Sequence, residues 1–164
     1  MNWHFDWNEG FMFSTSLIGL FVILSLRKHF DKMVFIIIWV YSLAFVETID
    51  YSVAASPFRY YYCGDNKTYE PSAAAIQLFL YPCFSYLFLF FYERWNITEK
   101  KLIVYFLAWD LLSVFFEWIN VINGVFTYTG WHLFYSAFVY PISCALLLIV
   151  YHFTKTQLKK PIQT

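Results

Sequence analysis

Charged residues are scarce in this sequence. Only 13% of the 164 residues are Asp, Glu, Lys or Arg, against roughly 25% in an average soluble domain. A soluble protein of this length would need more polar side chains to cover its surface. The formal net charge is zero, so the chain offers no basic surface to nucleic acid. This scarcity argues against a disordered chain, a nucleic-acid-binding domain and an ordinary cytosolic enzyme.

Cysteine is also rare, and the three cysteines, Cys63, Cys83 and Cys144, form no CxxC pair. Their odd number and wide spacing argue against a disulfide framework and a structural zinc site. The sequence contains no HExxH, GxSxG, Walker or GxGxxG motif, and no nucleophile–base pair is visible. We therefore expect a protein that is not an enzyme and that needs no cofactor or metal.

Apolar residues are abundant instead: 60% of the chain is hydrophobic and 25% is aromatic. Five apolar runs each have roughly the 17–25 residues that a helix needs to cross a bilayer. In lipid a helix satisfies its own backbone polar groups. The expected spans are 10–26, 33–53, 72–92, 102–119 and 133–153. The sequence thus predicts an all-α polytopic protein of the cell membrane, with one transmembrane domain over 1–164 that forms a five-helix bundle.

Basic residues gather on one side of these spans. Nine of them lie in the 27–32 loop, the 93–101 loop and the C-terminal tail, and only Arg59 and Lys67 lie on the other side. Cytoplasmic loops of membrane proteins carry the excess of Lys and Arg. The count therefore predicts an N-terminus outside the cell and a C-terminus in the cytoplasm.

Four acidic residues fall inside the expected spans: Glu47, Asp50, Asp110 and Glu117. Each ionised carboxylate there costs on the order of 3 kcal/mol, so such residues usually face the bundle interior and mark a site or pathway. The predicted topology places Asp110 near the membrane midplane and the other three acids in the outer half. Since no Lys or Arg lies inside a span, we expect these acids to form one outward-facing ligand-binding cavity for a proton, a metal cation or a cationic group.

Several polar side chains at similar depth could support this cavity. The main candidates are Ser113, Tyr81, Tyr140 and His132, and Gln77, Asn120 and Ser136 are expected at a similar depth. The matched pairs Tyr81-Pro82 and Tyr140-Pro141 predict kinks at similar depth, which can open a pocket between helices. Two alternatives remain: a polar network that only fixes helix packing, and acids that sit at the wet interface.

The 120–132 loop has a signal of its own. Asn123-Gly124 lies between short β-prone flanks, which is a cue for a two-residue hairpin. The alternative is an irregular loop at the membrane interface.

One segment resembles a known family. Phe116-Glu117-Trp118, followed by the run from Gly130 to Ser136, resembles a family of small multi-pass membrane proteins of spore-forming Firmicutes. The resemblance covers mainly residues 100–155. It implies a location in a bacterial cytoplasmic membrane, but no particular activity, ligand or cofactor. The five spans and the length are also similar to those of the tryptophan-rich sensory proteins, but the Trp-Pro signature of that family is missing here.

Two classes of function are compatible with these features. The first is binding or transport of a small cation or cationic solute through an outward-facing acidic cavity. The second is a non-enzymatic accessory subunit that packs against a larger membrane complex. The expected partners are the lipid bilayer and either another membrane protein or a second copy of this chain, but not nucleic acid.

The predicted topology can be tested with reporter fusions. A reporter fused after Thr164 should be active in the cytoplasm, and one inserted near Asn66 should be active only outside, because the basic loops are retained on the cytoplasmic side. A C-terminal reporter found outside the cell would overturn the orientation and the depth assigned to every intramembrane acid.

Overall fold

All five apolar runs fold into long helices. The computed structural model describes residues 5–55, 57–64 and 70–159. In this part of the chain five helices are long and apolar enough to cross a membrane: Trp7–His29, Lys32–Ala54, Pro71–Arg94, Glu99–Ile122 and Leu133–Leu158. They contain the five runs that the sequence predicts, most of them lengthened by a few residues. The all-α fold and the five long apolar helices are thus confirmed, the helices as candidate membrane spans, and the chain has the architecture of a multi-pass integral membrane protein.

In the described part of the chain, the spans and their connections consist of six α-helices, two strands and three short helical segments. The α-helices are α1 (Trp7–Leu26), α2 (Lys32–Asp50), α3 (Pro71–Ala75), α4 (Tyr81–Arg94), α5 (Glu99–Ile122) and α6 (Leu133–Leu158). The strands are β1 (Tyr61–Cys63) and β2 (Phe126–Tyr128). A 3₁₀ turn, η1 (Arg27–His29), follows α1, and two π-helical segments, η2 (Tyr51–Ala55) and η3 (Ile76–Leu80), follow α2 and α3.

The first two helices begin at acidic caps. Asp6 accepts a hydrogen bond from the Asn8 amide at 3.0 Å, and Glu9 accepts one from the Asp6 amide at 2.9 Å, which completes a capping box. Asp31 caps α2 in the same way, with the Met33 amide at 2.9 Å. Glu9 is only 1% exposed, and its role in the cap explains why a carboxylate is buried there.

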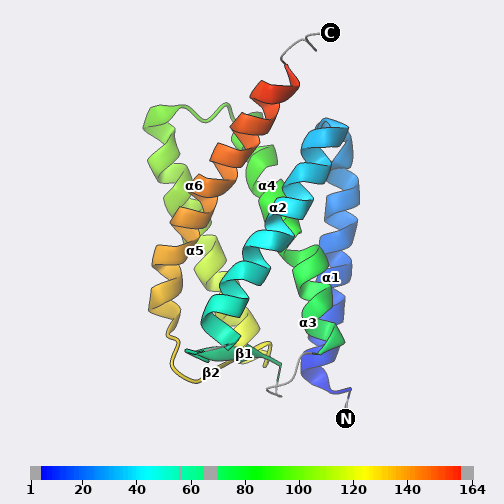
Figure 1. Ribbon diagram of the computed structural model, residues 1–164, viewed down its shortest axis with the longest axis vertical. Coiled ribbons are helices and arrows are strands. Elements are labelled where there is room, and N and C mark those ends of the chain that lie inside the picture. The colour runs from blue at the N-terminus through cyan, green and yellow to red at the C-terminus, as the bar shows by residue number, and fades with distance from the viewer. Residues whose placement is uncertain (1–4, 56, 65–69, 160–164) are drawn as a thin grey trace.

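The third span is the most buried of the five. About 44% of its most apolar stretch is buried inside the protein, against 17–28% for the other spans. Helix α1 packs along α3, η3 and α4, while α2 packs against α4 and α6, and α5 packs against α6 (Figure 1). Aromatic rings join α4 to α5, with the Phe84 and Phe116 centroids 4.8 Å apart. Four spans therefore surround one central space, and α1 flanks them.

Close packing fills the half of this bundle that lies away from the sheet. Tyr86 donates a hydrogen bond to the Phe35 carbonyl at 2.5 Å, and Tyr105 donates one to the Phe88 carbonyl at 2.5 Å. These tyrosines and Leu89 are buried in the larger of two apolar cores. Each phenol thus reaches a backbone carbonyl of another helix, which satisfies its polar group inside an apolar core.

The third span changes its helical form just before Pro82. Proline has no N–H to donate, so it cannot bond the carbonyl four residues earlier, which is that of Leu78. The indole N–H of Trp39 on α2 donates to this carbonyl at 3.0 Å. The π-helical segment η3 lies here, and π segments are often found at functional sites. The deviation that Pro82 predicts is thus a π segment with a partner from a neighbouring helix.

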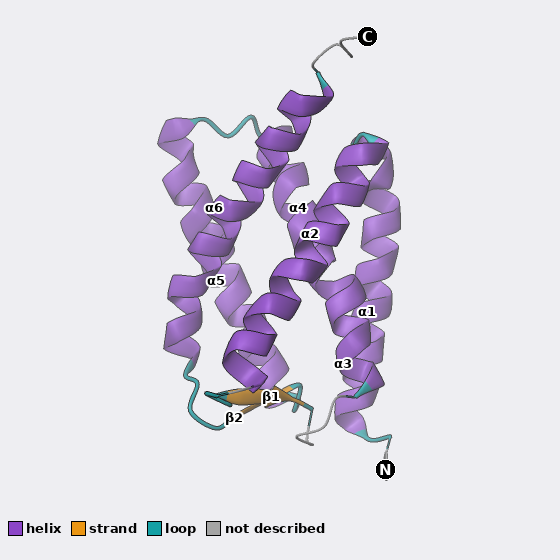
Figure 2. Cartoon of the chain, viewed as in Figure 1, coloured by secondary structure: helices purple, strands orange, loops and turns teal. Residues whose placement is uncertain are grey.

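Two short strands form an antiparallel sheet across one end of the bundle (Figure 2). Tyr61 pairs with Tyr128 and Cys63 pairs with Phe126, so the strands come from two different connections. The hairpin expected within 120–132 is therefore wrong. Helix α5 continues to Ile122 and takes up the first flank of that hairpin, so only the second flank, Phe126–Tyr128, is free to become a strand.

The two ends of the bundle differ in their charge. The start of α1 and both sheet-forming connections lie at one end, here called the sheet end, while the 27–31 and 95–98 connections and the end of α6 lie at the other (Figure 1). The latter end carries the basic loops. The predicted topology requires the three basic segments to lie at the same end of the bundle, as they do here. The orientation of this end relative to the cell remains a prediction.

The contact between Trp39 and Leu78 generates a test of helix packing. Replacing Trp39 with Phe should lower the free energy of unfolding by about 1 kcal/mol, because the Leu78 carbonyl, which Pro82 cannot bond, loses its indole donor. The loss should shrink in a Pro82→Ala background, where an amide at position 82 can bond Leu78 instead. Unfolding titrations of the four proteins in mixed micelles measure this coupling. Strictly additive effects would show that the indole does not replace the donor missing at Pro82.

Candidate functional site

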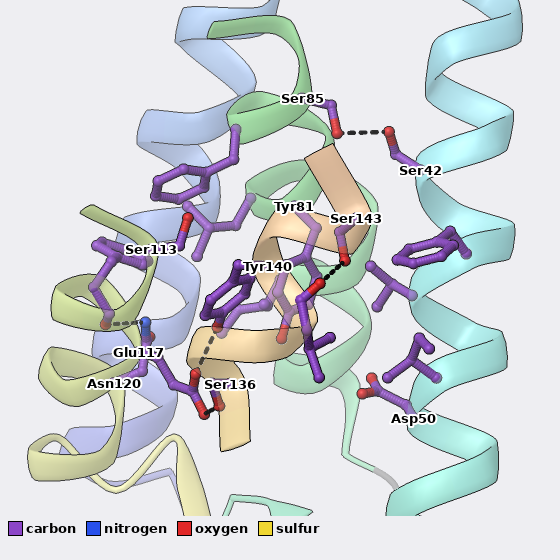
Figure 3. Close-up of a pocket in the computed structure, with 18 of the residues that line it drawn as sticks. Ser42, Asp50, Tyr81, Ser85, Ser113, Glu117, Asn120, Ser136, Tyr140 and Ser143 are labelled. Carbon is purple, nitrogen blue, oxygen red and sulfur yellow. Dashed lines mark hydrogen bonds between the residues drawn. The ribbon is translucent and has the colours of Figure 1, made fainter. Parts of the chain in front are cut away.

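A cavity of about 290 Å³ lies among α2, η3, α4, α5 and α6. Residues of both strands, including Tyr61 and Tyr128, line it at the sheet end. Its walls are mostly apolar, and its aromatic members include Phe45, Phe84, Phe88, Trp109, Phe116 and Trp131. Two acidic residues, Asp50 and Glu117, also line it, and Figure 3 shows them on opposite sides of the cavity. The site therefore combines aromatic walls with two separated carboxyl groups.

Asp50 is the last residue of α2, where the regular helix gives way to η2. Its Oδ1 accepts a hydrogen bond from the Tyr61 hydroxyl at 2.5 Å. Its Oδ2 accepts one from the Gln77 side-chain amide at 2.9 Å. Tyr61 belongs to β1 and Gln77 to η3, so three segments of the chain meet at this carboxyl group.

Glu117 lies on α5 and is only 7% exposed. Its Oε1 accepts hydrogen bonds from Tyr128 at 2.5 Å and from Ser136 at 2.8 Å. Its Oε2 accepts one from Tyr140 at 2.6 Å. The indole of Trp131 in turn donates to the Ser136 hydroxyl at 2.9 Å, which holds that hydroxyl toward the carboxyl group. A carboxylate is an acceptor-only group, and each of these three hydroxyls acts as a donor to it.

The two carboxyl groups are bound in the same pattern. Tyr61 and Tyr128 each follow their acidic partner by 11 residues. The two tyrosines are directly opposite each other on the paired strands β1 and β2. The second donors also match, because Gln77 stands four residues before Tyr81-Pro82 and Ser136 stands four residues before Tyr140-Pro141. The site is thus built from two similar arms, each made of a helix, a strand and a proline-containing helix.

No Lys, Arg or His is among the lining residues, all of which belong to the part of the chain that the structure describes. The donors to both acids are neutral hydroxyl and amide groups. Burial, followed by the charge of Asp50, raises the pKa of Tyr61, and burial together with the hydrogen bond to Glu117 raises the pKa of Tyr128. Both phenols therefore keep their protons and remain donors at neutral pH.

In the described chain, two lining residues have a buried polar atom without a hydrogen-bond partner, Tyr41 and Asn120. Of these, Asn120 is the more deeply buried. Its side chain is 3% exposed, and its Nδ2 donates to the Phe116 carbonyl at 2.8 Å. Its Oδ1 is buried without a hydrogen-bond partner. The contact with a carbonyl fixes which end of the amide is nitrogen. The free group is therefore an acceptor, and it lies one helical turn beyond Glu117.

The other predicted site residues divide into two groups. Ser113, Tyr81 and Tyr140 line the cavity. Glu47 does not line it and is exposed on α2, so the expectation that Glu47 converges with Asp50 is wrong. Three residues turn a helix by about 300°, which leaves these two acids about 60° apart around the axis. The offset places Asp50 at the edge of the cavity face and Glu47 beyond it.

Asp110 and His132 also lie outside the residues that line the cavity. Asp110 stands two turns before Glu117 on α5, which packs against α6. Its Oδ1 is buried and has no hydrogen-bond partner. His132 is exposed at the start of α6 and contacts the Tyr135 ring edge-on, with the centroids 5.6 Å apart. Neither residue joins Asp50 and Glu117 at the cavity.

Comparison with protein-family models, curated proteins and solved structures gives no match to this chain. The function therefore has to be argued from the cavity. Sequence reasoning missed Tyr61 and Tyr128 as partners of the acids, because both tyrosines lie outside the expected spans. The signal that could have found them is the equal spacing of 11 residues from each acid to its tyrosine.

Cys63 provides a chemical probe of this region. Burial raises the pKa of its thiol to about 12, with further contributions from the charges of Asp50 and Glu70. Since the thiolate is the reactive form, only about one thiol in ten thousand is ionised at pH 8. In a Cys83→Ala, Cys144→Ala background, N-ethylmaleimide should label the folded protein at least about a hundredfold more slowly than the unfolded chain. Asp50→Asn should raise the rate, and equal rates before and after unfolding would contradict this prediction.

Proposed function

We propose that this membrane protein binds a small organic cation in the cavity between α2, α4, α5 and α6. The observation that carries the proposal is the presence of two acidic residues, Asp50 and Glu117, in one cavity that no basic residue of the described chain lines. In the predicted orientation, the sheet end faces outside the cell, so the cation enters or is sensed from that side. Transport across the membrane would use the same cavity.

Charge complementarity supports a cationic ligand. Carboxylates inside a membrane usually pair with a cation or mark a ligand pathway, and the side chains of the described chain that donate hydrogen bonds to these two are neutral. A carboxylate has about four acceptor positions. Asp50 uses two of them and Glu117 uses three in the hydrogen bonds described above. Each acid therefore keeps capacity for a ligand.

The cavity walls favour an organic cation over a metal ion. Aromatic rings such as Phe84, Phe116 and Trp109 line the space, and such rings attract organic ammonium groups through their π faces. A metal ion would need several oxygen, nitrogen or sulfur ligands close together. In the part of the chain that the structure describes, no three His, Cys, Asp or Glu residues form such a group.

Binding of a simple amine tests the proposal. The purified protein in lipid nanodiscs is titrated calorimetrically with butylammonium chloride and with 1-butanol, which has a similar shape but no charge. Butylammonium should bind and butanol should not. Glu117→Gln should weaken butylammonium binding at least about tenfold, because it removes one of the two charges that attract the ligand.

The matched control is Glu47→Gln, which neutralises an acid one turn from Asp50 that lies outside the cavity lining. It should leave the affinity for butylammonium unchanged. Circular dichroism and thermal melts establish that each variant is folded. Equal binding of butanol and butylammonium, or an equal loss in both variants, would overturn the proposal.

A further inference from the structure

We infer that the cation is a diamine, with one primary ammonium group at Glu117 and Asn120 and the second at Asp50. This inference rests on the proposed function, because it names the ligand class of the same cavity. It depends on three features of the cavity: the separation of the two acids, the unused acceptor of Asn120, and the apolar walls between them.

The two acids form separate binding points. Asp50 is carried by α2 and Glu117 by α5, and they lie on opposite sides of the cavity (Figure 3). Each has its own set of donors, and no donor is shared between them. A ligand with a single positive charge would neutralise one acid and leave the other without a cationic partner, which is costly in an apolar environment. A ligand with a charge at each end satisfies both.

Asn120 indicates the kind of cationic group. Its Oδ1 is a buried acceptor without a partner, and leaving such a group unpaired is unfavourable. Glu117 and Asn120 are three residues apart on α5, and both line the cavity. A primary ammonium has several N–H donors and can bond both the Glu117 carboxylate and this oxygen. A quaternary ammonium has no N–H and would leave the Asn120 oxygen unpaired.

The remaining lining suits the part of a diamine between its two ends. Ile49, Phe84, Phe116 and Val139 line the cavity together with the two acids. A methylene chain makes favourable apolar contacts with such side chains. The arrangement therefore favours an unbranched alkyl chain with an ammonium group at each end.

The experiment compares ligands on the complete protein in nanodiscs. Linear α,ω-diaminoalkanes of three to eight carbons are titrated calorimetrically, and the tightest is compared with the n-alkylamine of the same length and with its fully N-methylated form. The diamine should bind at least about tenfold more tightly than the monoamine, because it engages both acids. It should also bind more tightly than the methylated form, which cannot donate to Asn120. These comparisons need no variant.

Three variants then assign the ends. Asp50→Asn and Glu117→Gln should each reduce the advantage of the diamine over the monoamine to less than about threefold. Asn120→Leu should weaken the primary diamine and leave the methylated form unchanged. Glu47→Gln, the control outside the cavity lining, should preserve every difference.

The outcomes separate this inference from the proposed function. If the monoamine and the diamine bind the wild-type protein equally well, the inference is wrong and the proposed function stands. If the methylated diamine binds as tightly as the primary diamine, the assignment of Asn120 is wrong. If no organic ammonium binds at all, the proposed function fails, and the diamine inference fails with it.

Discussion

A carboxyl group inside a membrane must find its hydrogen-bond partners within the protein, and this requirement organises the sheet end of the bundle. Asp50 and Glu117 lie on two helices that are separated by the cavity. The cross-strand pair Tyr61 and Tyr128 supplies one phenol to each of them. The two-stranded sheet thus connects α2 to α5 through side chains. Without the sheet, Asp50 would lose the Tyr61 hydroxyl and Glu117 would lose the Tyr128 hydroxyl. The remaining donors to Glu117 described above, Ser136 and Tyr140, both belong to α6.

The space between the helices has its origin in departures from regular helical geometry. The π segment η2 begins directly after Asp50, and the π segment η3 contains Gln77, which donates a hydrogen bond to Asp50. Pro82 follows η3 directly, and the Trp39 indole compensates for the missing backbone donor. In the half of the bundle away from the sheet, the larger apolar core around Tyr86 and Tyr105 packs without such interruptions. The cavity therefore lies where the third span is least regular.

Much of this architecture could be predicted because lipid imposes a simple composition on the spans. The five apolar runs correspond to the five long helices, and the presence of acids inside spans indicated Asp50 and Glu117 as residues of interest. Other features depend on rotation about a helix axis, which sequence separation specifies only coarsely. The three-residue spacing of Glu47 and Asp50 suggested one face, but Asp50 lines the cavity and Glu47 does not. The pairing of β1 with β2 was not predicted, because a local turn signal at Asn123-Gly124 competed with a partner far away in the sequence.

The origin of the sheet also constrains how the protein is made. Strand β1 leaves the ribosome two complete spans before β2, and β1 can pair only after α5 has inserted and β2 has emerged. Until then β1, which follows the second span, lacks its partner strand β2. The Asp50 carboxyl group depends on local donors or water during this time. The sheet can therefore close only late in synthesis, shortly before α6 adds its own contacts, and its closure joins segments that were inserted separately.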